Sequence, residues 1–128
     1  MKIAVDFDNT IASTVYPVIL APRMKVIMSL KHMKAAGHTI ILWTCRKGKA
    51  LEDAVAFCKE YGLEFDAVNE STKEDVEKWG GDTRKIWADI YIDDRAINPE
   101  DIGILVNNWC LTSTGGKENE RSGTVRSL

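Results

Sequence analysis

The chain contains five short runs of mostly apolar residues, and each run predicts a β-strand. None of them alternates strictly with polar residues, which is the pattern of a strand with one face in water. Each strand is therefore expected to be buried on both faces. The runs are residues 2–7, 38–44, 65–68, 90–92 and 102–106.

Segments with helical spacing of apolar residues separate these runs. Helices are predicted to begin near Met24 and near Leu51, and glycines at 37 and 62 end them. Ser71 and Glu74 have the spacing of a capping box, so a short helix is expected to start at Ser71-Thr72 and to run through Trp79. Residues 13–21 are expected to form a loop, and Pro22 suits the first turn of the helix that follows. Strands alternating with helices predict a three-layer, Rossmann-like α/β domain with a mostly parallel sheet.

Length, charge and cysteine content indicate a single domain that lies in a reducing compartment and does not span a membrane. A chain of 128 residues with a net charge of −2 fits one domain, expected over residues 1–111, followed by a mobile tail over 112–128. Without a basic excess, net charge does not indicate a nucleic-acid partner, although it leaves one open. Three cysteines in no metal-binding pattern favour a reducing cytoplasm, and no apolar run is long enough to span a membrane.

Polar side chains gather where the predicted strands end. In a parallel sheet these carboxyl ends meet at one edge, which is where ligands bind. Clustered carboxylates would repel each other without a cation, and oxygen ligands at this density favour Mg²⁺. Neighbouring hydroxyl and basic groups would supply donors to a phosphoryl group. The residues are Asp6, Asp8 and Thr10 after the first strand, Thr44 and Arg46 after the second, and Asp93 and Asp94 after the fourth.

Four segments of the chain resemble, in order, the four motifs of the haloacid dehalogenase (HAD) superfamily. They are DFDNT at 6–10, ILWTCR at 41–46, TRKIWAD at 83–89 and YIDDR at 91–95. The resemblance runs from Lys2 to about Val106. It implies a five-stranded sheet whose strands, numbered along the chain, lie in the order 5-4-1-2-3.

The resemblance also implies roles for individual residues. Asp6 would be the nucleophile that forms an aspartyl-phosphate, and Asp8 would be the general acid and base. Thr44 would bond a phosphoryl oxygen, and Lys85 would neutralise charge, with Arg84 and Lys73 as alternatives for that role. The implied metal site consists of Asp6, Asp8 through its backbone carbonyl, Asp93 and Asp94, with Mg²⁺ as the cofactor.

Further residues beside these motifs are expected to contact substrate. Asn9 stands where this family usually has Gly, and Asn tolerates the left-handed conformation that such a turn needs. The predicted substrate-binding set is Asn9, Thr10, Thr44, Cys45 and Arg46.

The gaps between the motifs are too short to hold a cap domain. The site is therefore expected to be open, or covered by a second copy of the chain or by the substrate itself. Residues 13–21 and 69–82 are the candidate lids. The expected function is a Mg²⁺-dependent phosphomonoester hydrolase acting on a phosphorylated small molecule or macromolecule.

Alternative functions start from the same residues. One is a catalytically silent binding protein that keeps the fold, and another is a phosphatase specific for polynucleotide ends or phosphoproteins. Transfer of the phosphoryl group to an acceptor other than water is a third. A two-component receiver domain is disfavoured, because its phospho-acceptor Asp follows the third strand, whereas the third predicted strand here ends in Val68-Asn69.

Overall fold

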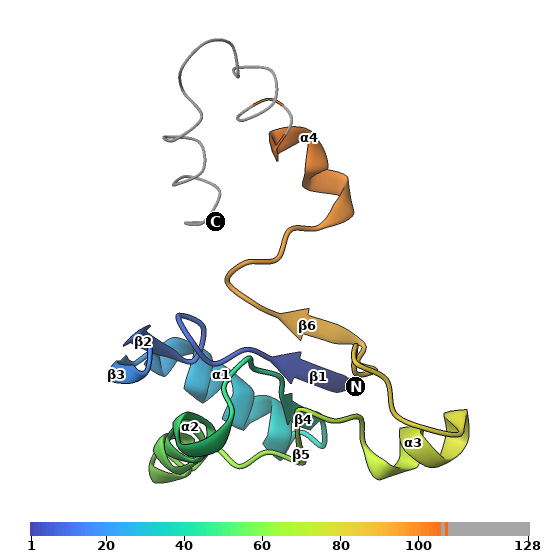
Figure 1. Cartoon of the computed structure of the whole chain (residues 1–128), viewed down its shortest axis with the longest axis horizontal. Coiled ribbons are helices and arrows are strands. Elements are labelled where there is room, and N and C mark those ends of the chain that lie inside the picture. The colour runs from blue at the N-terminus through green and yellow to red at the C-terminus, as the bar shows by residue number, and fades with distance from the viewer. Residues whose placement is uncertain (106, 108–128) are drawn as a thin grey trace. The chain divides into compact units, whose positions relative to one another are not determined.

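The computed structural model describes residues 1–105 and residue 107 (Figure 1). The chain divides into two compact units, Met1–Asp93 and Asp94–Leu128. The predicted boundary at residue 111 and the predicted tail, 112–128, lie outside the described residues. No helix in the described part of the chain is long and apolar enough to cross a bilayer.

The first unit is built on a parallel sheet of four strands. The strands are β1 (Lys2–Val5), β4 (Thr39–Leu42), β5 (Ala67–Val68) and β6 (Ile90–Ile92), and they lie in the order β5-β4-β1-β6. Each lies inside one of the apolar runs that predicted it. Strand β1 is one of the two inner strands, and Asp6 lies just beyond its end.

Side chains alternate between the two faces of this sheet, and different segments cover each face. On one face, Ile3 and Val5 of β1 pack with buried residues of α1 (Met24–Ala35) and α2 (Gly48–Glu60). On the other face, Ala4 packs with Ile86 and Ala88, which precede β6. Both faces are buried, as the unbroken apolar runs predict.

The prediction of a loop over 13–21 is wrong. These residues form a second, antiparallel sheet of two strands, β2 (Ala12–Val15) and β3 (Val18–Pro22). Pro22 consequently ends a strand and does not begin helix α1. The hairpin carries four β-branched residues, Thr14, Val15, Val18 and Ile19, which fit a pleated strand better than a loop.

The predicted fifth strand is also wrong, so both the strand count and the strand order differ from the prediction. Residues of the second unit form a 3₁₀ turn, η1 (Pro99–Asp101), and then a helix, α4 (Ile102–Leu105). Asn98 caps this turn by accepting a hydrogen bond from the Glu100 N–H at 3.0 Å. Val106, which the prediction includes, lies outside the described residues.

Helix α3 (Lys73–Trp79) begins directly after the predicted start at Ser71-Thr72 and ends at Trp79, as predicted. Thr72 is the N-cap, and its hydroxyl accepts from the Asp75 N–H at 3.4 Å. Gly80 ends the helix in the left-handed conformation, with φ of 77°.

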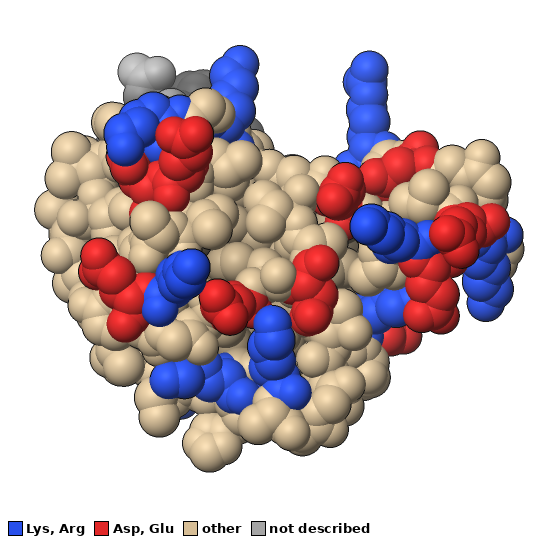
Figure 2. Space-filling model, turned by 90° about the horizontal axis from the view of Figure 1, so that it is seen from below, with Lys and Arg blue, Asp and Glu red and all other residues tan. Residues whose placement is uncertain are grey.

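Charged side chains are mixed on the face of the described chain that Figure 2 shows. Lys and Arg lie among Asp and Glu there and do not form one basic stripe. This face therefore lacks the continuous basic track by which proteins hold a polynucleotide through its phosphates.

Candidate active site

Asp6 and Asp93 lie together at the carboxyl edge of the sheet. The Asp6 N–H donates to the Ile92 carbonyl at 2.9 Å, which continues the pairing of β1 with β6. A carboxylate oxygen of Asp6 lies within 4.8 Å of one of Asp93. Asp94 is joined to Asp93 by a peptide bond and is the first residue of the second unit. Oxygen donors at this spacing fit a hard divalent cation such as Mg²⁺.

A tight turn follows Asp6 and orients the residues of the first motif. Three successive N–H groups, those of residues 10–12, donate to the Phe7 carbonyl. Asn9 has a φ of 57°, the left-handed conformation that the sequence predicts at this turn and that Asn tolerates better than most residues. Thr10 is buried, and its hydroxyl donates to the Asp6 carboxylate at 3.4 Å.

The carboxylate of Asp8 is held by three hydrogen bonds. Its Oδ1 accepts from the Thr14 hydroxyl at 2.7 Å and from Nη2 of Arg46 at 2.8 Å, and its Oδ2 accepts from Nε of Arg46 at 2.9 Å. Burial raises the pKa of Asp8, but the hydrogen bonds from Arg46 and Thr14 and the charge of Arg46 outweigh burial. The pKa of Asp8 therefore lies below its usual value.

Arg46 is buried beneath the surface, although the sequence predicts that it contacts substrate. Its side chain is 0% exposed, and its ion pair with Asp8 joins the second motif to the first. Contact with a substrate would require Arg46 to leave this ion pair. A buried arginine is uncommon, and its pairing with Asp8 explains how the fold accommodates it.

Thr44 follows β4 and is positioned by Asn69, a residue that sequence reasoning left without a role. The Asn69 side-chain oxygen accepts from the Thr44 N–H at 2.7 Å, and the Thr44 hydroxyl accepts from the Arg46 N–H at 3.1 Å. Asn69 itself has a φ of 55° just after β5. The sequence signal that could have identified Asn69 as a site residue is its position directly after the predicted strand 65–68, at the edge of the sheet where ligands bind. Cys45, between Thr44 and Arg46, is exposed.

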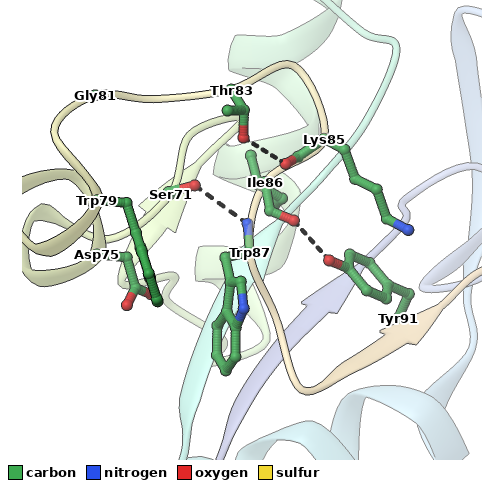
Figure 3. A pocket seen from close by; sticks show the side chains of 9 residues that line it. All are labelled: Ser71, Asp75, Trp79, Gly81, Thr83, Lys85, Ile86, Trp87 and Tyr91. Carbon is green, nitrogen blue, oxygen red and sulfur yellow. Dashed lines mark hydrogen bonds between the residues drawn. The ribbon is translucent and has the colours of Figure 1, made fainter.

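Lys85 borders a cleft of about 390 Å³ on the side of the sheet that residues 71–91 cover (Figure 3). Its ammonium lies 5.1 Å from the centre of the Tyr91 ring, so the side chain points toward β6. Trp79 and Trp87 also line the cleft and are 66% and 44% exposed. The candidate lid over 69–82 therefore contributes a wall of this cleft.

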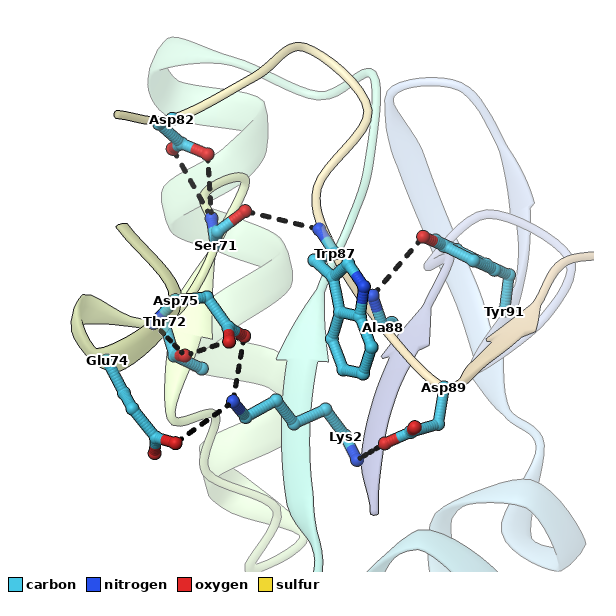
Figure 4. Close-up of polar contacts among 10 residues, drawn as sticks. All are labelled: Lys2, Ser71, Thr72, Glu74, Asp75, Asp82, Trp87, Ala88, Asp89 and Tyr91. Atoms are coloured by element: carbon cyan, nitrogen blue, oxygen red, sulfur yellow. Dashed lines mark hydrogen bonds and ion pairs between the residues drawn. The ribbon is translucent and has the colours of Figure 1, made fainter. Parts of the chain in front are cut away.

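Partly buried polar contacts hold the segment that carries Lys85 (Figure 4). Lys2 at the start of β1 donates to Asp75 of α3 at 2.8 Å. The Ser71 N–H donates to the Asp82 carboxylate at 3.3 Å, and the Ser71 hydroxyl accepts from the Trp87 N–H at 3.2 Å. These bonds tie α3 and the residues before β6 to the sheet.

The stability of the protein is expected to fall in acid. Hydrogen bonds from Lys2 lower the pKa of Asp75 despite its burial, and hydrogen bonds from Ser71 and the backbone of residue 83 lower the pKa of Asp82. With Asp8, three carboxylates thus have pKa values below their usual values. Their contribution is complete above the unfolded-state pKa of roughly 4 and is lost as the pH falls through the lower folded-state values.

Thermal unfolding between pH 7 and pH 3 measures this dependence. The melting temperature should be nearly flat from pH 7 to about 5 and should decline below about 4. In Asp75→Asn one of these groups cannot titrate, so the decline should be shallower. A melting temperature that stays constant to pH 3 would contradict the contacts described for these carboxylates.

The comparisons with known proteins place the chain in a family through one solved structure. No family model matches the chain, and no curated protein matches it. It is similar to a solved structure described as that of a conserved protein coded by a locus from Bacteroides thetaiotaomicron, with 38% sequence identity and a TM-score of 0.68. The match covers 89% of this chain and 93% of the Bacteroides chain. The chain therefore belongs to the same family as the Bacteroides protein.

Proposed function

We propose that the chain is a Mg²⁺-dependent phosphomonoester hydrolase of the HAD type, acting through an aspartyl-phosphate at Asp6. The observation that carries this proposal is the proximity of the Asp6 and Asp93 carboxylates at the ends of two paired parallel strands. The chain also supplies, in the order of the HAD motifs, an acid and base at Asp8, a phosphoryl-binding hydroxyl at Thr44 and a cation at Lys85.

The reaction has two steps. In the first, an Asp6 carboxylate oxygen bonds to phosphorus, the bond from phosphorus to the leaving oxygen breaks, and that oxygen takes a proton from the protonated form of Asp8. The lowered pKa of Asp8 makes this form scarce at neutral pH, so we expect the first step to be faster in mild acid for esters with poor leaving groups. In the second, water attacks the same phosphorus, gives a proton to Asp8, and the bond to Asp6 breaks. Inorganic phosphate is released and Asp6 is regenerated as a carboxylate.

Other groups stabilise charge on the transferring phosphoryl group. Asp6, the backbone carbonyl of Asp8 and Asp93 would hold Mg²⁺, with Asp94 acting through water or by orienting the site. The cation would neutralise charge between the carboxylates and the phosphoryl oxygens. The Thr44 hydroxyl would donate to one of those oxygens, and the Lys85 ammonium would offset their charge.

The proposal covers a broad class of phosphorylated substrates. Met1–Asp93 is a single compact unit in which no insertion between the strands separates as a unit of its own, and we infer from this a site without a cap domain. An uncapped site admits a phosphorylated small molecule or the phosphorylated end of a macromolecule, and a second copy of the chain would be a further way to cover it.

Hydrolysis of p-nitrophenyl phosphate tests this function. Because p-nitrophenolate is a stable anion, it leaves without needing a proton, so with this substrate the first step does not use Asp8 as an acid and Asp8 acts only as the base of the second step. We expect turnover with Mg²⁺, loss of turnover with EDTA, and recovery when Mg²⁺ is restored. Turnover that persists in EDTA would contradict the proposed metal dependence.

Binding of Mg²⁺ is measurable apart from catalysis. A ligand that binds only the folded state stabilises it by about 2.7 kcal/mol at a concentration of 100 Kd. Mg²⁺ should therefore raise the melting temperature of the wild type, and the rise should be much smaller in Asp93→Asn. Asp53→Asn, on helix α2, is the matched control and should respond like the wild type. Equal responses in Asp93→Asn and the control would remove Asp93 from the site.

A further inference from the structure

Arg46 is a fully buried cation whose donors serve three separate segments. Besides its two bonds to Asp8, its Nη1 donates to the carbonyls of Pro17, in the turn of the β2–β3 hairpin, and Ala50, in the first turn of α2, each at 3.2 Å. The guanidinium carbon lies 4.9 Å from the centre of the Phe7 ring and 5.2 Å from that of Tyr16. The planar group is thus fixed by both hydrogen bonds and aromatic contacts.

Asp8 depends on this arrangement for the direction of its side chain. Both carboxylate oxygens accept from Arg46, and the third donor, Thr14, belongs to the hairpin strand β2. A carboxylate held at both oxygens by the fork of a guanidinium has a defined plane as well as a defined position. Asp8 is therefore oriented jointly by Arg46 and the hairpin.

We propose that Arg46 is a positioning residue that fixes the orientation of the Asp8 carboxylate and links it to the β2–β3 hairpin. This inference rests on the proposed function, in which Asp8 exchanges a proton with the leaving group and with water. In this proposal Arg46, whose side chain is buried against Asp8, contacts neither the substrate nor phosphorus. It acts through Asp8, so its contribution to turnover exists only while Asp8 is present.

A double-mutant cycle measures that dependence. The four proteins are the wild type, Arg46→Lys, Asp8→Asn and the double variant, assayed with p-nitrophenyl phosphate and Mg²⁺. Lysine keeps the charge but cannot supply the two parallel bonds. A misplaced reacting group costs on the order of 100-fold, so Arg46→Lys should lower kcat by roughly 10- to 100-fold with little change in KM. In the Asp8→Asn background the same substitution should lower kcat no further.

Equal losses in both backgrounds would overturn the proposal, since Arg46 would then act only by supporting the fold. If Arg46→Lys does not fold, Thr14→Val serves as a second variant. It removes the hydroxyl by which the hairpin strand β2 donates to Asp8. That variant should lower kcat by a smaller factor, and the loss should again vanish in Asp8→Asn. An effect of Thr14→Val that is independent of Asp8 would overturn the proposal equally.

Crystal structures of the wild type and of Thr14→Val or Arg46→Lys separate this inference from the proposed function. The expected result is an Asp8 carboxylate that rotates away from its wild-type orientation in the variant. An unchanged orientation would overturn the positioning role even if the wild type hydrolyses phosphate esters. A wild type without Mg²⁺-dependent turnover would instead contradict the proposed function, whatever the orientation of Asp8.

Discussion

Replacing Asp6 with Asn is expected to abolish phosphatase activity while leaving the fold intact. The amide has nearly the shape of the carboxylate but is a poor nucleophile and would be a weaker Mg²⁺ ligand. Loss of a nucleophile in enzymes that form covalent intermediates lowers kcat by factors on the order of 10⁴ to 10⁶. Initial rates with p-nitrophenyl phosphate and saturating Mg²⁺ measure the effect.

Two comparisons make the Asp6→Asn result specific. Asp53→Asn removes a carboxylate from helix α2 that is paired with Lys49 at the surface, and it should retain the wild-type rate. Melting temperatures should show that Asp6→Asn remains folded under the assay conditions. A folded Asp6→Asn protein with more than about one hundredth of the wild-type kcat would exclude Asp6 as the nucleophile.

Replacing Arg46 with Met is expected to cause the largest loss of stability among substitutions around the site. Methionine fills part of the volume but leaves the partly buried Asp8 carboxylate without its cation. Removing one partner of a buried ion pair costs about 3–5 kcal/mol, because the remaining charge is left unpaired. The Pro17 and Ala50 carbonyls also lose their donor. Denaturant unfolding at pH 7 gives the free energy directly.

The control for Arg46→Met is the exposed pair between Lys49 and Asp53, whose atoms lie 2.8 Å apart. Lys49→Met should cause little change in unfolding free energy, since exposed pairs contribute little. Adding Asp8→Asn to Arg46→Met should recover part of the lost stability by removing the unpaired charge. A loss below about 1 kcal/mol in Arg46→Met would show that the ion pair is not the buried contact described.

Much of the sheet could be predicted from the sequence because its strands are short apolar runs buried on both faces. The run at 90–92 coincides with β6, and those at 2–7, 38–44 and 65–68 contain the other strands. Apolar runs of this length can also be helical, which is why residues 102–105 were predicted as a strand and form helix α4. The cap at Asn98 and the following Pro99 were the local signals for a helix there.

Less of the site could be predicted, because side-chain partners far apart in sequence determine it. The proximity of Asp6 and Asp93 could be predicted, because parallel strands end at one edge of a sheet. The burial of Arg46 depends on Asp8, 38 residues earlier, and on a hairpin turn that was predicted to be a loop. A basic residue beside a loop is usually solvated, so neither local composition nor spacing could indicate this ion pair.

Detection of the phosphoryl group on Asp6 tests the central claim most directly. The protein would be mixed with p-nitrophenyl phosphate and Mg²⁺, quenched, and reduced with borohydride, which converts an aspartyl-phosphate to homoserine that peptide mass spectrometry locates. The predicted result is modification at residue 6, dependent on Mg²⁺ and increased in Asp8→Asn, in which breakdown of the intermediate is slower. Turnover without modification of Asp6, or modification at another carboxylate, would contradict the account. Absence of both turnover and modification would favour a binding protein that keeps the fold.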